Sequence, residues 1–215
     1  MGKEWNKYLK LRKERPDLFT NSGPIKIVSD KKIIKKFERS RKKKIGVVYE
    51  SEYHTMVVDL VYEEEGEYFT YERLLYGPES GAVVCVPMYQ KNFVLLKQYR
   101  HAIRDTQYAF PRGFGSAGVS AEENARKEIQ EELGATVLKS QYIGEIVADS
   151  GLSGGTVSVY LCEIDRPSTL QGYEGIEAVE VISEETLKEM ICSGKITDGY
   201  TLGAFAYLAV KGRLM

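Results

Sequence analysis

The spacing of apolar and polar residues divides the chain into a short N-terminal part and a longer C-terminal part. Residues 3–14 have the pattern of a basic helix that ends near Pro16, and 25–28 have that of a short strand. From Ile45 three runs rich in Val, Tyr and Leu predict strands, and the last two flank a turn at 63–67. We therefore expect a basic helix and strand segment, followed by a small antiparallel sheet, within residues 1–78.

A second pattern begins near Gly81 and predicts a separate domain over residues 79–215. Two apolar strands, AVVCVPMY and NFVLLKQYR, are joined at 90–92, and a loop then leads to a helix from Ala121 to Leu133. Further strands are expected at 137–148, 156–164 and 178–182, and helices at 184–192 and 200–210. Alternation of strands and helices without repeats predicts a mixed α/β fold.

Composition is that of a soluble globular protein, with 43% hydrophobic and 28% charged residues among 215. No apolar run approaches the roughly 18 residues of a membrane span. The first residues are charged where a signal peptide is apolar, which predicts a cytoplasmic protein. The three cysteines and two histidines lack the spacing of a zinc site, so we expect them to be structural.

Charge is unevenly distributed along the chain. Residues 1–46 hold 16 Lys and Arg against 5 Asp and Glu, a net of +11, so the remainder carries −12 of the total −1. A basic segment can bind nucleic acid or steer phosphorylated ligands, and it can also be a solvated surface or a docking face. The run 31–44 has few apolar residues and no interleaved aromatics, which favours the surface interpretation. Nucleic acid is therefore not the expected partner.

The helix from Ala121 to Leu133 has strong end signals. Ser120 and Glu123 form a predicted capping box, and Gly134 is a typical C-terminal stop. The predicted core stripe recurs every four residues and consists of Ala121, Ala125, Ile129 and Leu133.

Three glutamates of this helix, Glu128, Glu131 and Glu132, share a neighbouring face. At about 100° per residue, Glu132 lies about 40° to one side of Glu128 and Glu131 about 60° to the other. Their mutual repulsion and their place in the C-terminal half of the helix are both unfavourable. Bound Mg²⁺ resolves both effects, since it prefers carboxylate oxygens. The alternative is a solvated acidic face with Arg126 and Lys127 as counterions.

The segments before the helix strengthen the metal hypothesis. A glycine-containing loop, FPRGFG at 110–115, allows close approach of a ligand to the backbone. Arg100, Arg104 and Arg112 lie just upstream and are suited to bidentate binding of phosphate or carboxylate. Cations also neutralise the charge on a phosphoryl group under attack.

These residues resemble the Nudix hydrolase signature, G-x5-E-x7-R-E-U-x-E-E-x-G-U, in which U is a bulky apolar residue. Gly113 matches the opening glycine, and KEIQEELGA at 127–135 matches the ending in register. Val119 replaces the signature's first glutamate, Lys127 its arginine, and Ala135 its last bulky residue. The resemblance implies that, in other members of the family, this glutamate and this arginine pair with each other and hold the loop to the helix. Their replacement brings the affinity for ligands and the catalytic efficiency into question more than the type of reaction.

The resemblance extends from about Ile45 and points to the branch that hydrolyses ADP-ribose and related nucleoside diphosphate sugars. It rests on the order LKQYR, FPRGF, the signature, DSGLSGG and an acidic loop. It implies a Nudix α/β/α sandwich with a mixed sheet, preceded by the small antiparallel sheet. It also implies a homodimer in which the N-terminal sheet is exchanged or packed between subunits.

The resemblance further implies the ligands of the metal. Glu128 and Glu132 are expected to ligate Mg²⁺, or Mn²⁺, with Glu131 as a further ligand or a base. The backbone carbonyl of Arg112 matches a further metal contact.

Roles toward the substrate, a small nucleotide diphosphate, also follow from the resemblance. Arg100, Arg112 and Gly113 are expected to contact it. The general base is expected to be a loop glutamate, and the candidates are Glu174 and Glu177. We favour Glu174, because Gly175 indicates a mobile loop whereas Glu177 begins the strand.

Two alternatives stay open. Val119 and Lys127 allow a catalytically weak nucleotide-binding or regulatory module on the same fold. The basic N-terminal segment allows a hydrolase of RNA ends. Arg112, which replaces a small residue often found in ADP-ribose hydrolases, leaves dinucleotides open as substrates.

Overall fold

A computed structural model of the chain describes residues 2–64, 66–76, 81–116, 118–168 and 174–212. It divides into two compact units, one of Met1–Gly77 with Asp149–Gly155 and the other of Pro78–Ala148 with Thr156–Met215. The domain boundary expected at 78/79 lies outside the described residues. The segment 149–155, which joins two strands of the larger unit, belongs by its contacts to the smaller one.

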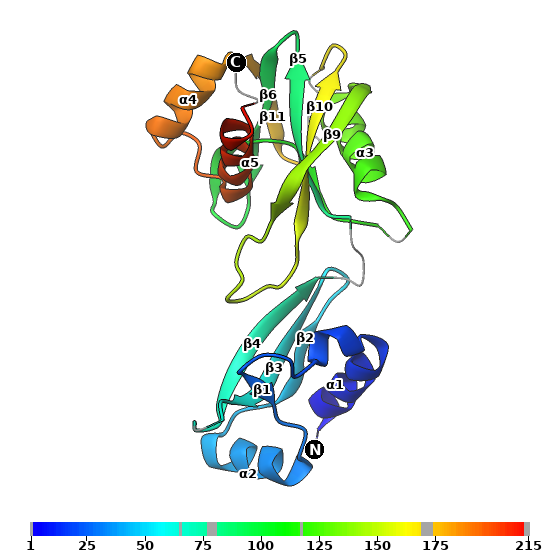
Figure 1. Cartoon of the computed structure of the whole chain (residues 1–215), viewed down its shortest axis with the longest axis vertical. Coiled ribbons are helices and arrows are strands. Elements are labelled where there is room, and N and C mark those ends of the chain that lie inside the picture. The colour runs from blue at the N-terminus through cyan, green and yellow to red at the C-terminus, as the bar shows by residue number, and fades with distance from the viewer. Residues whose placement is uncertain (1, 65, 77–80, 117, 169–173, 213–215) are drawn as a thin grey trace. The chain divides into compact units, whose positions relative to one another are not determined.

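The larger unit is built on a seven-stranded mixed sheet (Figure 1). Its main path runs β11-β6-β5-β10-β9, where β5 and β10 are parallel and the other neighbours antiparallel. The strands are β5 (Val83–Tyr89), β6 (Asn92–Arg100), β7 (Asp105–Ala109), β8 (Arg112–Gly113), β9 (Val137–Ile146), β10 (Val157–Ile164) and β11 (Ile176–Ile182).

Strands β5 and β6 pair only at their hairpin, through Met88–Phe93 and Tyr89–Asn92. Beyond the hairpin, β7 pairs with β6 and β8 pairs with β5. This separation of two central strands brings the short strand β8 into the sheet. Gly113, the opening glycine of the signature, is thereby fixed opposite Val83.

Helices cover both faces of this sheet (Figure 1). Helix α3 (Ala121–Leu133) buries Ala125, Ile129 and Leu133 in a core with one face. On the other face, a second core includes residues of α4 (Glu184–Cys192) and α5 (Gly199–Val210). These three layers confirm the predicted α/β/α sandwich with a mixed sheet, and the capping box of Ser120 and Glu123 is present as predicted.

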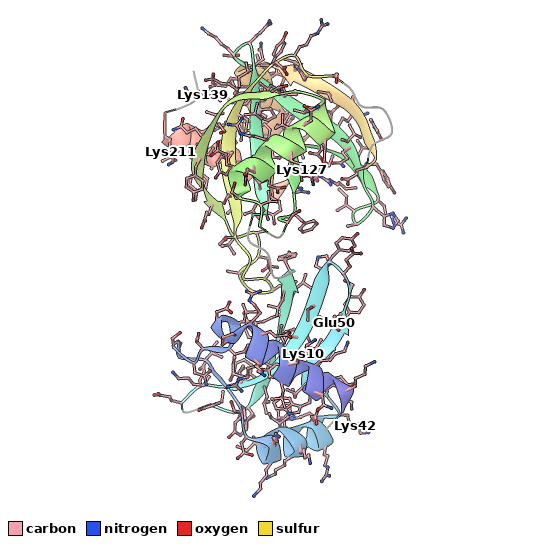
Figure 2. The ribbon with its side chains drawn as sticks, turned by 90° about the vertical axis from the view of Figure 1, so that its right-hand side faces the viewer. Lys10, Lys42, Glu50, Lys127, Lys139 and Lys211 are labelled. Carbon is pink, nitrogen blue, oxygen red and sulfur yellow. The ribbon has the colours of Figure 1, made fainter. Side chains whose placement is uncertain are left out.

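The smaller unit contains the predicted antiparallel sheet. Strand β3 (His54–Tyr62) pairs with β4 (Phe69–Tyr76) on one edge and with β2 (Gly46–Glu50) and the short β1 (Lys26–Ile27) on the other. Its core includes Trp5 and Tyr8 of α1 (Lys3–Glu14) and Phe19 of a 3₁₀ helix, Pro16–Phe19. Helix α1 lies across the sheet, with Lys10 on it (Figure 2). The segment 149–155 reaches β4, where the Leu74 N–H donates to the Leu152 carbonyl at 2.8 Å.

The sequence-based expectation missed four elements: the 3₁₀ helix, the short strand β8, helix α2 and strand β7. Helix α2 (Lys31–Arg41) begins at Asp30, whose side chain accepts from the backbone of Lys32 and Ile33, and it buries Ile34. Its few apolar residues suffice because the sheet supplies the rest of the core. Strand β7 lies in the expected loop, because β6 offers it a free edge. Among the described residues, no helix has both the length and the apolar character needed to span a membrane.

Candidate active site

Gly113 lies against the carboxylate of Glu128. A Cβ at position 113 would be 2.0 Å from Cδ of Glu128 and 2.0 Å from its Oε1. The absence of a side chain at Gly113 therefore allows helix α3 to present Glu128 directly against strand β8. Glu128 is 9% exposed, so its carboxylate lies within the structure and not on a solvated face.

Glu132, one turn further along α3, is more deeply buried and only 2% exposed. Its Oε2 accepts a hydrogen bond from the backbone N–H of Arg112 at 3.2 Å. Strand β8 thus contacts both glutamates, through Gly113 at one and Arg112 at the other. The predicted metal contact of the Arg112 carbonyl stays a prediction.

Burial makes both carboxylates reluctant to ionise. It raises the pKa of Glu128 to about 7, with a lowering contribution from Lys127 and raising ones from Glu131 and Glu174. It raises the pKa of Glu132 to about 8, aided by Glu128 and Glu174 and opposed by the Arg112 N–H and Arg100. The pair needs protons or a cation to offset its mutual repulsion.

Glu131 occupies a different environment. Its side chain is 38% exposed and pairs at 3.4 Å with Lys127, which Figure 2 labels on α3. Arg126 is engaged elsewhere, with Glu122, Ser140 and the Val137 carbonyl. The counterion alternative therefore describes Glu131 and not the two buried glutamates, and the ligand role of Glu131 stays a prediction.

Arg100 ends strand β6 and brings an unsatisfied cation to the site. Its Nε and Nη2 are buried and have no hydrogen-bond partner within the described part of the chain. Burial lowers its pKa, Arg112 lowers it further, and Glu132, Asp198 and Glu174 oppose that change. Buried donors without partners are unfavourable unless a ligand completes them.

The Arg112 side chain is held by helix α5. Its Nη1 donates to Oδ1 of Asp198 at 2.6 Å, and its guanidinium lies 4.9 Å from the centroid of the Tyr200 ring. Asp198 also caps α5, since its Oδ2 accepts from the backbone and hydroxyl of Thr201. The Arg112 side chain, which the sequence analysis expects to contact the substrate, is therefore tied to α5, and its substrate contact stays a prediction. Arg104, the third predicted arginine, is exposed in the turn between β6 and β7.

The two candidate bases differ sharply in their surroundings. Glu174 has φ of 46° and its carbonyl accepts from Nε2 of Gln98 at 2.8 Å, while its carboxylate influences the pKa of Glu128, Glu132 and Arg100. Glu177 instead pairs with Lys97 at 3.0 Å and accepts from Thr106. Of the two candidates, Glu174 is the one that contributes to the raised pKa of both buried glutamates.

Gly175 is anchored to strand β6, and the mobility expected of its loop stays a prediction. Its carbonyl accepts from the Tyr99 N–H at 2.9 Å, and a Cβ there would lie 3.1 Å from the Tyr99 carbonyl. With φ of +78°, Gly175 permits a close approach of the loop to β6. The loop before it, 169–173, lies outside the described residues.

Two site residues were missed by sequence reasoning. Asn124 is fully buried on α3, four residues before Glu128, so the helical period that groups the glutamates also places it on their side. Asp198 precedes Thr201 by three residues, a spacing typical of a helix N-cap. Both signals are present in the sequence, but neither identifies the partner.

The surroundings of the two buried glutamates fit a hard divalent cation. No Lys or Arg among the described residues forms an ion pair with Glu128 or Glu132. The absence of a side chain at Gly113 leaves room for the Glu128 carboxylate. No set of three Asp, Glu, His or Cys side chains in the described ranges is grouped closely enough to hold a metal. An ion here would rely on two carboxylates, backbone oxygen and retained water, which suits Mg²⁺.

Comparisons with known proteins agree with this geometry. Residues 78–193 match the NUDIX domain family. Over 141 residues the chain is 30% identical to an ADP-ribose pyrophosphatase of Bacillus subtilis (strain 168). The aligned region covers 64% of this chain and 75% of that protein.

A similar fold is found in a crystal structure of an ADP compounds hydrolase. The TM-score is 0.67 and the sequence identity 17%, over 80% of this chain and 95% of that one. The family match covers more than half of the chain and includes the helix with both buried glutamates. The chain therefore belongs to the Nudix family, as a pyrophosphohydrolase similar to ADP-ribose pyrophosphatases, which confirms the resemblance drawn from its sequence.

Proposed function

We propose that the protein hydrolyses the diphosphate linkage of a nucleoside diphosphate derivative, ADP-ribose or a related nucleotide sugar, in a Mg²⁺-dependent reaction. The observation that supports this most strongly is that two buried carboxylates, Glu128 and Glu132, lie within electrostatic reach of the unsatisfied guanidinium of Arg100. The carboxylates suit a divalent cation, and the guanidinium suits the anion that the cation would accompany. The relative named an ADP-ribose pyrophosphatase supports the substrate class.

Each residue has a distinct task in the proposed reaction. Glu128, Glu132 and the Arg112 carbonyl would hold the metal, with Glu131 as a candidate outer ligand. When bound, the metal supplies neutralisation of the phosphoryl charge and activation of water. The Nε and Nη2 of Arg100 donate to the diphosphate oxygens. Gly113 contributes by leaving space for the Glu128 carboxylate.

Glu174 is the proposed general base. It is coupled to the same two glutamates, and Gln98 and Gly175 fix its backbone on β6. Its carboxylate accepts a proton from the attacking water, which adds to one phosphorus as the bond to the bridging oxygen breaks. A nucleoside monophosphate is one product.

Turnover assays test this proposal. Purified protein is incubated with Mg²⁺ or Mn²⁺ and with ADP-ribose, sugar nucleotides, dinucleotides or capped RNA, and the products are separated by chromatography. We expect turnover of ADP-ribose or a sugar nucleotide, and its loss in Glu132→Gln, which keeps the size of the side chain. Tight binding without turnover by the wild type would instead identify a regulatory module.

One observation keeps the RNA-end alternative under test. Nine Lys and Arg between residues 31 and 44 are exposed and form no ion pair with described residues, and Lys42 lies at the end of α2 (Figure 2). Nearby acids are used internally: Asp30 caps α2, and Glu38 accepts from the Ile45 N–H. Deletion of 1–44 would remove core residues, so the informative variant reverses Lys35, Lys36 and Arg39 to Glu. Capped-RNA turnover that falls in this variant while ADP-ribose turnover persists would favour the alternative.

A homodimer formed through the smaller unit is also proposed. Strands β2 and β4 carry large apolar side chains at the surface, including Val48, Tyr49 and Phe69. Sedimentation or light scattering tests this directly, and a monomer at micromolar concentration would refute it.

A further inference from the structure

The side-chain amide of Asn124 lies between two backbone carbonyls from separate segments. Its Nδ2 donates to the Gly81 carbonyl at 2.9 Å and to the Phe114 carbonyl at 3.0 Å. Asn124 is fully buried at the fourth position of helix α3. Because both neighbours are acceptors, only the amide NH₂ can face them.

Asn is a poor choice for this position on local grounds. It is a weaker helix former than Ala, and a buried amide is unfavourable unless it is hydrogen-bonded. Its Oδ1 is buried without a hydrogen-bond partner among the described residues, which adds to the cost. The two donated bonds offset this cost by satisfying two backbone carbonyls, and they tie both carbonyls to helix α3.

Three backbone segments meet at Asn124. Gly81 precedes β5 and has φ of +118°, and a Cβ there would lie 3.2 Å from the Val119 carbonyl and 3.5 Å from Cα of Gly115. The backbone of Gly81 thus packs directly against backbone atoms of Gly115 and Val119. The two bonds of Asn124 link the first two of these segments to α3.

The loop that Asn124 holds is the loop that carries Gly113. Phe114 follows Gly113 directly, and the carboxylate of Glu128, one turn after Asn124, fills the space beside Gly113. A shift of the loop on α3 would therefore change the space available to Glu128. At the signature positions for a loop-to-helix ion pair, this chain has Val119, which is apolar, and Lys127, which pairs with Glu131 instead.

We propose that Asn124 is a positioning residue that fixes the loop 113–116 on helix α3 and so sets the place of Glu128 at the metal site. It does so in place of the ion pair that Val119 and Lys127 do not form. The proposal rests on the function proposed above for its kinetic readout, whereas loop protection and metal affinity test it independently of turnover.

The experiment compares Asn124→Ala and Asn124→Asp with Gln130→Ala, an exposed control on the same helix. Three quantities are measured on the full chain: Mn²⁺ affinity by electron paramagnetic resonance, amide exchange of the peptide 113–120, and kcat and KM on the diphosphate that the wild type turns over best. Thermal denaturation confirms that each variant is folded.

We expect Asn124→Ala to weaken Mn²⁺ binding and lower kcat by about tenfold to 100-fold, as for other residues that orient metal ligands. Exchange in 113–120 should quicken, and KM should change little because Arg100 is untouched. Asn124→Asp should be worse, since it sets an anionic oxygen against two carbonyls. If Asn124→Asp does not fold, the Ala variant decides alone.

A rescue variant separates positioning from simple packing. Val119→Glu with Lys127→Arg, added to Asn124→Ala, restores the signature pair and should recover Mn²⁺ affinity and loop protection. The proposal is overturned if Asn124→Ala keeps wild-type metal affinity, exchange and kcat, or changes only the melting temperature. If the wild type hydrolyses no diphosphate but Asn124→Ala still loosens the loop and weakens Mn²⁺ binding, the proposed function fails and the positioning role stands.

Discussion

Gly113 and Glu128 occupy one space: the carboxylate of Glu128 lies where a side chain at 113 would be, 2.0 Å from an added Cβ. The contact joins strand β8 to helix α3 at the proposed metal site. It explains in steric terms why the signature opens with glycine at this position. The position of Glu128, a proposed metal ligand, therefore depends on the absence of a side chain at Gly113.

Replacement of Gly113 by Ala is the first prediction. The new methyl group must displace the Glu128 carboxylate, which is the end of a flexible side chain, so the fold should survive. We expect kcat/KM to fall by about tenfold to 100-fold, with a higher Mg²⁺ concentration for half-maximal activity. The melting temperature should change little. Gly154→Ala is the control, since no atom lies within 4 Å of a Cβ there, and equal activity of both variants would contradict the steric account.

Local sequence signals were enough to place helix α3 and its glutamates. Three signals lie within the helix itself: the capping box at Ser120, the C-terminal stop at Gly134 and apolar residues that recur every four positions. They can therefore be recognised without a tertiary structure. The spacing of Glu128 and Glu132 likewise put them on one face. Helix α2 was missed because its apolar residues are few and its stability depends on packing against the sheet.

Tertiary contacts decide what the spacing left open. Glu131 is three residues from Glu128 and Glu132 is four, so both can share a face with it. Glu131 nevertheless pairs with Lys127 at the surface, because packing against the sheet determines which side of α3 is covered. Arg100 and Arg104 are four residues apart, and the turn after β6 buries one and exposes the other. The partner of Arg112, Asp198, is 86 residues away and carries no sequence mark of that pairing.

The raised pKa values of Glu128 and Glu132 predict how metal-free stability depends on pH. The unfolded chain releases these protons near pH 4.5, whereas the folded protein keeps them to about 7 and 8. The folded state therefore binds more protons between these values, and its free energy of unfolding falls as pH rises through this window.

Thermal denaturation in the presence of a chelator measures this effect. The melting temperature should fall between pH 5 and 8, and Glu132→Gln, which cannot ionise, should reduce the fall by on the order of 5 °C. Mg²⁺ should raise the melting temperature more at pH 8 than at pH 5, because it competes with protons for the same oxygens. Glu131→Gln is the control, and an identical pH slope in Glu132→Gln and wild type would refute the assignment.

Arg100→Met tests whether the buried guanidinium is kept for the substrate. Loss of two unsatisfied buried donors should stabilise the free protein by about 1–3 kcal/mol, while loss of the phosphate contact should raise KM by about tenfold or more. Higher stability with poorer binding is the diagnostic combination. Arg104→Met, in the exposed turn, should change neither quantity. A lower melting temperature with unchanged KM would show that Arg100 is structural.

The last prediction concerns which of two glutamates, three residues apart in sequence, is the general base. Glu174 is coupled to Glu128 and Glu132, whereas Glu177 is held by Lys97 and Thr106 at the surface of β11 and β6. Glu174→Gln should therefore lower kcat by about 100-fold or more with little change in KM, since proton acceptance contributes about 10²–10⁴ to a rate. Glu177→Gln should keep kcat and lose at most a little stability, because exposed ion pairs contribute about 1 kcal/mol or less. Single-turnover kinetics on both variants measure the chemical step directly. A large loss in Glu177→Gln with an active Glu174→Gln would reverse the assignment, and activity in both would move the base to another residue.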